Sequence, residues 1–485
     1  MSNSAFQSAG RATSTKRSTS VSSTSPPTLI RGARAIITGL AGERARSSAT
    51  DIRIDAGRIT DVGHLTALPG DTVIDASGCV VYPGWVNTHH HLFQTMLKGV
   101  PGGINASLAQ WLVEVTARYR HTIDAEALET AATVGIVELM LSGCTTIADH
   151  HYLYYPDIAF DGARILFEVA ERLGVRFVLC RGGMTRPQPG FETDIPRELR
   201  PESVGAIIDD VAGLVHRYHD PDPLSMRRVV MAPTTPTYRV RPEELREMAR
   251  AARSLGIRLH THLSENLDYL RYFREAHDRS PVEFCADHEW IGPDVWFAHL
   301  CHTSDAEIAL MARNRTGIAH CPASNCRLGS GIASAPQMAA AGMPVSLAVD
   351  GAASNEAADM LSEAHTAWLV HRAAKGLGRF EGGGDAVTAE QVIEWGTSGG
   401  AGILGLHTGA IEPGRAADLA VYSLDAPRYM GLHDPAIGPV VSGGRPTLRC
   451  LLSAGRVVVR DDAIPGVDLV ELAARAQAVV RRISA

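Results

Sequence analysis

The sequence predicts an α/β protein built around a closed (β/α)8 barrel, and three observations lead to that fold class. Short apolar runs alternate with longer helical stretches through the middle of the chain, and eight such units in succession are typical of this barrel. Both flanks of this middle part are instead rich in short strands, which indicates a separate small sheet domain. Polar side chains collect where the apolar runs end, and such barrels carry their chemistry at the C-terminal strand ends.

The eight apolar runs mark the barrel strands that we expect. They cover residues 84–91, 144–151, 176–184, 228–236, 258–265, 295–300, 317–324 and 344–352. The first belongs to a stretch, Val81–Asn87, that reads as one buried strand entered through the Pro83–Gly84 turn. Between the runs lie segments such as RPEELREMARAARSLG, whose apolar residues recur with the helical period of 3.6.

The flanking strands indicate how the chain divides into domains. We expect residues 29–84 and 405–485 to form one composite sheet domain with a C-terminal helix, and residues 85–404 to form the barrel inserted between its halves. Residues 1–28 are rich in Ser and Thr, contain three basic residues and lack acidic ones, so a disordered extension is the expectation. The same composition suits an organelle transit peptide, but no amphipathic period supports that alternative.

Composition and charge limit the class of protein. The content is 45% apolar and 20% charged, as in soluble globular proteins, and no apolar run approaches the roughly 20 residues needed to span a bilayer. A net charge of -7 argues against a nucleic-acid polymer or an anionic membrane as partner. The eight cysteines form no Cys-x-x-Cys pair, which indicates small core residues in a reducing, cytoplasmic compartment.

Three consecutive histidines end the first barrel strand, in VYPGWVNTHHHLFQ. Because side chains alternate along a strand, His89 and His91 point to one side and His90 to the other. Two imidazoles at a strand end can therefore bind one metal ion. A solvated turn is the alternative for this stretch alone.

Further candidate ligands end three other predicted strands. His262 and Glu265 end the fifth, His299 the sixth and Asp350 the eighth. Three imidazoles and one carboxylate suit a zinc-like divalent ion that keeps a position open for water, so we predict His89, His91, His262 and Asp350 as ligands. His260 is a rival for His262, but it lies two residues deeper in the barrel and is expected to be a packed, hydrogen-bonded strand histidine.

These residues predict a hydrolytic site. A bound divalent ion can lower the pKa of its water toward about 7 and so supply hydroxide at neutral pH. Glu265 could take a proton from that water and deliver it to a substrate nitrogen. His299 could hold the attacking oxygen, and Asp350 could both ligate the metal and accept a proton. A surface salt bridge is the alternative role for Glu265, and a core histidine is the alternative for His299.

The chain after residue 28 resembles the amidohydrolase superfamily, and within it the mononuclear aromatic deaminases and triazine hydrolases. The resemblance rests on PGWVNTHHHLFQ, SGCTTIADHH, HTHLSEN, AHCPASNCRLGSG, AVDGAASN and the C-terminal GRAADLAVYSLDAPRYMGLHDPAIGPVVSGGRP. It implies a distorted (β/α)8 barrel with a composite β-sandwich, one zinc or iron ion, and a homo-oligomer. It also implies His89, His91, His262 and Asp350 as ligands, Glu265 as the proton shuttle and His299 as the histidine that contacts the reacting water.

The resemblance also narrows the metal count and the reaction. Binuclear relatives bridge two metals with a carboxylated lysine after strand four, and RVVMAPTTP contains no lysine, so one divalent ion is expected, zinc in the first place and iron as the alternative. The motifs are most similar to bacterial enzymes that deaminate 8-oxoguanine or isocytosine. We therefore expect a small-molecule substrate with a 2-amino-4-oxopyrimidine ring, as in 8-oxoguanine, isocytosine, guanine and pterins.

Three residues are candidates for holding that ring. The amide of Gln94 could pair with a ring N–H and a carbonyl, Trp111 could stack on a flat heterocycle, and Arg181 could bind a ring oxygen. A core aromatic is the alternative for Trp111. Two other functions stay open: a hydrolase of triazines or other chloro- or alkylamino-heterocycles with the same metal site, and a catalytically silent scaffold. Glu265 favours deamination, because an amine leaving group needs a proton and chloride does not.

Overall fold

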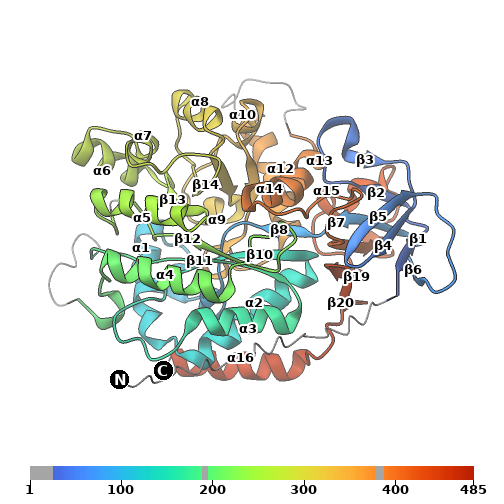
Figure 1. Cartoon of the computed structure of the whole chain (residues 1–485), viewed down its shortest axis with the longest axis horizontal. Helices are drawn as coiled ribbons and strands as arrows, with labels where there is room; N and C mark the ends of the chain where they lie inside the picture. Colours follow the sequence, from blue (N-terminus) through green and yellow to red (C-terminus); the bar gives the residue numbers. More distant parts are fainter. Residues whose placement is uncertain (1–25, 188–194, 237, 377–386, 485) are drawn as a thin grey trace, which may run out of the picture.

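A computed structural model describes residues 26–187, 195–236, 238–376 and 387–484. Its centre is a sheet of eight parallel strands in the order β16-β15-β14-β13-β12-β11-β10-β8, surrounded by helices (Figure 1). These strands are β8 (Trp85–Asn87), β10 (Cys144–His151), β11 (Arg176–Arg181), β12 (Arg227–Met231), β13 (Leu259–Leu263), β14 (Val295–His299), β15 (Gly317–His320) and β16 (Val345–Leu347). The prediction of a (β/α)8 barrel is confirmed.

The barrel is nearly closed, and polar contacts complete the ring. Thr88 and Ser346 hydroxyls lie 2.6 Å apart where β8 meets β16. Above them a short parallel pair joins β9 (His90–His91) to β17 (Asp350–Gly351), with Asp350 opposite His90. This pair brings the first and last strands together at the end of the barrel where the predicted ligands lie.

Two further sheets use strands from both ends of the chain. A six-stranded sheet has the order β20-β19-β18-β7-β2-β3, and a four-stranded sheet has the order β5-β4-β1-β6. Their strands are β1 (Thr28–Arg31), β2 (Ala35–Ile37), β3 (Arg46–Ser47), β4 (Asp51–Asp55), β5 (Arg58–Gly63), β6 (Thr72–Asp75), β7 (Cys79–Pro83), β18 (Leu419–Ser423), β19 (Leu448–Ser453) and β20 (Arg456–Arg460). The domain boundaries at residues 84 and 405 stay a prediction, and the predicted disordered extension lies almost wholly outside the described residues.

One detail of the strand prediction is wrong. Val81–Asn87 is not a single strand, because β7 pairs with β18 in the six-stranded sheet while β8 pairs with β10 in the barrel. Gly84 separates them, and its N–H donates to the Asp418 carbonyl. A Cβ at this position would lie 2.3 Å from the Thr145 hydroxyl, so only glycine fits where the chain passes from one sheet to the other.

Helices cover the outside of the barrel. In chain order the α-helices are α1 (Leu108–Trp111), α2 (Ala125–Leu141), α3 (Gly162–Leu173), α4 (Val204–Tyr218), α5 (Pro242–Ser254), α6 (Leu267–His277), α7 (Pro281–Asp287), α8 (Asp305–Arg313), α9 (Pro322–Arg327), α10 (Ala335–Ala340), α11 (Ala352–Asn355), α12 (Met360–Gly376), α13 (Ala389–Glu394), α14 (Gly400–Leu404), α15 (Gly438–Val441) and α16 (Leu469–Ile483). Side-chain caps start many of them: Asp124 accepts from the Ala127 N–H at α2 and Asp161 from the Arg164 N–H at α3. None of the helices among the described residues has the length and apolarity to cross a bilayer.

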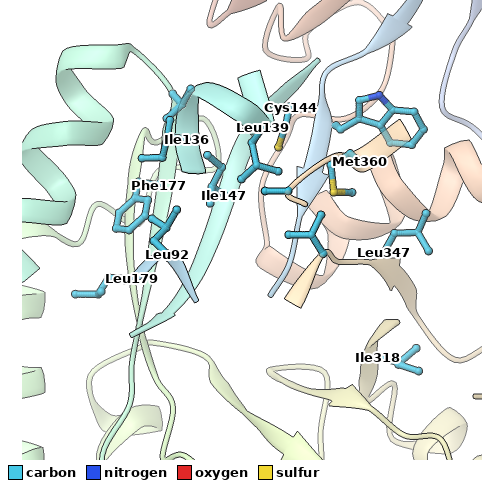
Figure 2. Packing of buried hydrophobic residues seen from close by; sticks show 14 of the residues in the cluster. Leu92, Ile136, Leu139, Cys144, Ile147, Phe177, Leu179, Ile318, Leu347 and Met360 are labelled. Carbon is cyan, nitrogen blue, oxygen red and sulfur yellow. The ribbon is translucent and has the colours of Figure 1, made fainter. Parts of the chain in front are cut away.

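The main core lies between the barrel strands and the helical layer. Ile147 and Phe177 on the outer face of the barrel pack with Ile136 and Leu139 of α2, all at most 1% exposed (Figure 2). The alternate strand residues Ala148, Val178 and Cys180 form a separate cluster inside the barrel. Because both faces of these strands are buried, their residues form continuous apolar runs, and the polar functional residues lie at the strand ends.

Candidate active site

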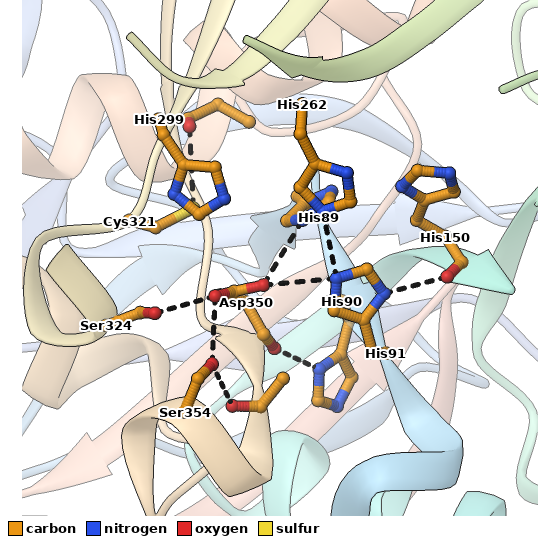
Figure 3. Close-up of polar contacts among 12 residues, drawn as sticks. His89, His90, His91, His150, His262, His299, Cys321, Ser324, Asp350 and Ser354 are labelled. Carbon is orange, nitrogen blue, oxygen red and sulfur yellow. Dashed lines mark hydrogen bonds and ion pairs between the residues drawn. The ribbon is translucent and has the colours of Figure 1, made fainter. Parts of the chain in front are cut away.

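The structure brings the four predicted ligands together at the C-terminal end of the barrel (Figure 3). Asp350 Oδ1 lies 3.3 Å from His89 Nε2 and 3.2 Å from His91 Nε2, and His91 Nε2 lies 3.2 Å from His262 Nε2. Two overlapping groups each place four possible ligand atoms within 4.8 Å of one another. One joins His89, His91, His150 and His262, and the other joins His89, His262, His299 and Asp350.

Main-chain carbonyls orient two of the imidazoles. His91 Nδ1 lies 2.8 Å from the His150 carbonyl oxygen, and His262 Nδ1 lies 2.6 Å from the Thr234 carbonyl oxygen. Because a carbonyl only accepts, each Nδ1 carries the proton and each Nε2 presents a lone pair to the centre. This second layer of contacts is the usual way in which a protein orients metal-binding histidines.

A third histidine is oriented through His260. His260 Nδ1 lies 3.0 Å from the Trp296 carbonyl oxygen and must donate to it, so its Nε2 accepts. His89 Nδ1 lies 2.7 Å from that Nε2 and therefore donates, which leaves the Nε2 of His89 as a lone pair. His260 also stacks on the Trp296 ring, at a centroid distance of 4.5 Å. It is a packed, hydrogen-bonded strand histidine, as expected.

These atoms fit a divalent cation. Three imidazole lone pairs and a carboxylate oxygen converge in a buried space, and the Nε2 of His89 has no hydrogen-bond donor. Burial holds the pKa values of His89 and His262 well below the usual histidine value. Burial opposes ionisation of Asp350, but the neighbouring imidazoles of His89, His91 and His299 hold its pKa well below the usual value. Neutral imidazoles and an ionised carboxylate are the protonation states that metal binding requires.

Asp350 is held by its own set of contacts. The hydroxyls of Ser324 and Ser354 donate to its Oδ2 at 2.6 and 2.9 Å, which leaves Oδ1 facing the imidazoles. Its backbone has a φ of 57°, in the left-handed region that non-glycine residues rarely adopt. A strained residue held by two hydroxyls and the β9–β17 pair indicates a functional position.

Glu265 and His299 lie beside this cluster. The Glu265 carboxylate is 3.8 Å from His299 Nε2, and its other oxygen accepts from the Ser330 hydroxyl at 3.4 Å. Burial raises the pKa of Glu265. Burial opposes the charged form of His299, but the Glu265 and Asp350 carboxylates outweigh it and raise its pKa. His299 Nδ1 donates to the Asn325 side-chain oxygen at 2.9 Å, so its Nε2 faces Glu265 and the centre.

The cluster lines a cavity at the C-terminal end of the barrel. Its lining includes His91, His262, Glu265, His299 and Asp350, together with Gln94, Trp111, Arg120, Tyr152 and Arg239. The Gln94 amide donates to the Tyr152 hydroxyl at 2.9 Å, and its Oε1 has no donor. The Trp111 indole donates to the Ala353 carbonyl at 3.0 Å, which fixes its ring as a wall of the cavity.

Arg181 does not line this cavity, contrary to its predicted place in substrate binding. Its guanidinium pairs with Glu202 at 2.7 and 3.0 Å and with Asp210 at 2.9 Å, and it stacks on Tyr154. The reason is strand parity. Phe177 and Leu179 lie in the outer core and Cys180 lies inside the barrel, so Arg181 points outward.

Sequence reasoning missed two arginines of the lining. Arg120 donates to the main-chain carbonyls of Glu198 and Tyr152, and Arg239 lies on the loop after β12. Burial lowers the pKa of Arg239 to about 10. No motif marks either residue. Only the position of Arg239 a few residues past a barrel strand could have suggested it.

The comparisons with known proteins agree with this geometry. The amidohydrolase family profile matches residues 80–458. The chain is 53% identical to an isoxanthopterin deaminase from an unknown prokaryotic organism over 472 residues, which cover 95% of this chain and 98% of that protein. It is 36% identical to an 8-oxoguanine deaminase from Pseudomonas aeruginosa, covering 89% and 94%. The zinc complex of atrazine chlorohydrolase from Arthrobacter aurescens superposes with a TM-score of 0.86 at 29% identity, covering 93% and 100%.

Proposed function

The chain belongs to the amidohydrolase family, and on that premise we propose that it is a metal-dependent deaminase of pterin or 8-oxoguanine type. The reaction removes the 2-amino group of a 2-amino-4-oxopyrimidine ring by hydrolysis and releases ammonia. One observation carries the proposal: a buried carboxyl with a raised pKa, Glu265, lies beside a set of converging ligand atoms, and both line one cavity.

The proposed ligands are His89, His91, His262 and Asp350. A divalent ion held there supplies the Lewis acidity that makes water a nucleophile at neutral pH. Zinc is the first choice, because the related atrazine chlorohydrolase is solved with zinc. Iron is the alternative, since the same donor types also bind it. The absence of a lysine near the end of β12 favours a single ion.

Proton transfer falls to Glu265. Its carboxylate accepts a proton as water attacks the amino-bearing carbon, and it delivers that proton to the adjacent ring nitrogen. A raised pKa suits this dual role, because the group must both gain and lose a proton near neutral pH. His299 holds the attacking oxygen through Nε2. Asp350 then takes the second proton from that oxygen and passes it to the amino group, so the tetrahedral carbon collapses to a carbonyl as ammonia leaves.

Ring recognition uses the opposite wall of the cavity. The unpartnered Oε1 of Gln94 can accept from a ring N–H or the amino group, and Trp111 provides a flat face. The guanidinium groups of Arg120 and Arg239 give this lining a positive potential, which favours rings rich in carbonyl oxygens. A second cavity shares Arg239 and Glu265 and adds Tyr238 and Tyr269, so it extends the space available to a fused bicyclic ring.

A substrate panel tests the proposal. We expect metal-loaded protein to release ammonia from isoxanthopterin, pterin and 8-oxoguanine, with kcat/KM at least about a hundredfold above that for adenosine or cytosine. Release of chloride or alkylamine from an s-triazine, with no ammonia from the pterins, would instead support the triazine hydrolase alternative. Loss of neither group from any compound would contradict both.

The cellular compartment and the oligomeric state of the enzyme are two further parts of the proposal. All eight cysteines are free and seven are buried, which fits a reducing, cytoplasmic compartment. The family resemblance also leads us to propose a homo-oligomer. Light scattering on the purified full chain gives its mass directly, and a monomeric mass would contradict that part of the proposal.

A further inference from the structure

One more histidine lies in the barrel next to the proposed ligands. His150 is the seventh residue of β10 and is fully buried. Its Nε2 lies 2.7 Å from the Ala232 carbonyl oxygen and therefore donates to it. Its Nδ1 is left as a lone pair, and none of the residues that the structure describes gives it a hydrogen bond.

The His150 ring faces the ligand cluster. Its centroid lies 4.8 Å from that of His262, 5.5 Å from His91 and 5.6 Å from His89. Figure 3 shows the ring beside His262 with one nitrogen turned toward it. His150 and these three histidines each offer one possible ligand atom, and the four atoms lie within 4.8 Å of one another.

The neighbours of this lone pair cannot supply a proton to it. His91 and His262 each carry their proton on Nδ1, where a main-chain carbonyl accepts it, and the Nδ1 proton of His89 goes to His260. The nitrogens of these three rings that face the centre are therefore also lone pairs. A group of four buried imidazole lone pairs is stabilised by a cation placed among them.

We propose that the Nδ1 of His150 is a further ligand of the metal centre, which then uses four imidazoles and the Asp350 carboxylate. This inference rests on the ligand set of the proposed function and extends it. Five protein donors and one water suit an ion that accepts five or six ligands, so the centre also accepts iron, cobalt or manganese. A tetrahedral site would use fewer protein donors.

Two matched variants test the assignment. His150→Phe removes the lone pair, and His151→Phe changes the next residue, which is equally buried but faces the opposite side of β10, toward Gly162 of α3. With metal-free protein and a competing chelator, we expect His150→Phe to bind Co²⁺ at least about tenfold more weakly than wild type. His151→Phe should bind it within about twofold of wild type.

The visible spectrum of the cobalt protein separates a ligand from a merely supporting residue. The ligand-field absorption of Co²⁺ strengthens as its number of ligands falls, and His150→Phe lowers that number from six to five. The bands should therefore intensify in His150→Phe and stay unchanged in His151→Phe. Equal affinity, or weaker binding with an unchanged spectrum, would overturn the assignment.

A measurement on the unaltered chain covers the case in which His150→Phe does not fold. X-ray absorption of the zinc-loaded wild-type protein counts the imidazoles on the ion. Four imidazoles support the proposal, and three overturn it. Ammonia release is not used in these tests, so their failure leaves the deaminase proposal standing, and failure of the substrate panel leaves the ligand assignment standing.

Discussion

The two ends of the barrel bury charged groups in opposite ways. At the N-terminal end, Arg176 and Asp418 are fully buried and form an ion pair at 2.5 Å. Arg176 also donates to the Ser225 carbonyl, and Asp418 accepts from the Ala454 N–H and the Thr408 hydroxyl. The protein therefore satisfies these charges with its own groups, and it joins the barrel to the six-stranded sheet by doing so.

At the C-terminal end, several buried polar atoms lack hydrogen-bond partners among the described residues and the backbone is strained. The Nε2 of His89, the Nδ1 of His150 and the Oε1 of Gln94 have no hydrogen-bond partner. His299 and Asp350 both have positive φ angles, at 75° and 57°. Unsatisfied groups and strain together indicate an end shaped for a ligand, whereas the opposite end is shaped for stability. The predictions that follow test this contrast.

The largest effect is expected for Asp350→Ala at the C-terminal end. Loss of the only carboxylate among the proposed ligands should weaken metal binding by more than about a hundredfold and abolish turnover. The metal-free variant should melt no lower than the metal-free wild type, because three neutral imidazoles no longer surround a buried carboxylate. Metal analysis and calorimetry measure both. A variant that keeps one full equivalent of metal would refute the role of Asp350.

Glu265→Gln should separate chemistry from metal binding. The amide fills the same space but cannot accept a proton, so kcat should fall by about 10²- to 10⁴-fold. Metal content should stay at the wild-type value, because Glu265 is outside the proposed ligand set. Steady-state ammonia release together with metal analysis checks the prediction, and near-normal turnover would assign the proton transfer to another residue.

Arg176→Met tests the opposite end of the barrel. It leaves Asp418 buried without its cation and should lower the free energy of unfolding by about 3–5 kcal/mol. The double variant Arg176→Met with Asp418→Leu should recover much of that loss. Denaturant unfolding measures the stability, and metal affinity serves as the control. If metal affinity falls more than stability in the folded variant, the two ends are not independent.

Gln94→Leu should raise KM or lower kcat/KM by about 10- to 100-fold, because the substrate then faces an apolar group in place of an amide. Arg181→Lys is its comparison, since Arg181 was predicted to contact the ring and instead pairs with Glu202 and Asp210. That change should affect stability and leave KM for the substrate unaltered. Equal kinetic losses in both variants would contradict the described cavity.

The smallest effect concerns pH and Asp149, on the outer face of β10. Its Oδ1 accepts from the Leu92 N–H, its Oδ2 lies 3.9 Å from His151 Nδ1 without a hydrogen bond among the described residues, and burial raises its pKa to about 7. The folded protein then binds this proton more tightly than the unfolded chain. The resulting stability is complete below pH 4 and is lost as the pH rises to about 7. In Asp149→Asn this decline should be absent. The free energy of unfolding of the variant, relative to that of wild type, should therefore rise between pH 4 and pH 7, which denaturant unfolding curves measure.

Local patterns predicted the elements that depend on neighbours in the chain. The alternation of apolar runs and helices predicted the barrel, and strand parity placed His89 and His91 on one side, where both face Asp350. The structure places Glu265 and His299 beside them, although their roles stay predictions. Each of these residues ends a strand, and parallel strand ends meet at one place.

Features that depend on contacts across the chain were not predictable. Arg181 lies at the end of a strand, as His262 does, but its side chain points out of the barrel and binds Glu202. No local sequence pattern predicts that Glu202 lies there. Main-chain carbonyls orient His91 and His262, and His260 orients His89. Every residue has a main-chain carbonyl, so the sequence cannot show which one binds an imidazole. His150 lies one residue before the end of β10, and no pattern in the sequence singled it out, because its place beside the other histidines depends on contacts between strands.

A metal titration of the wild-type protein tests the central claim most directly. Metal-free protein receives zinc in steps, and the rate of ammonia release from isoxanthopterin is measured after each step. We expect no release without metal, a linear rise to one equivalent per chain, and no further rise beyond it. Release by metal-free protein, or a plateau only at two equivalents, would contradict a single metal ion acting at the C-terminal end of the barrel.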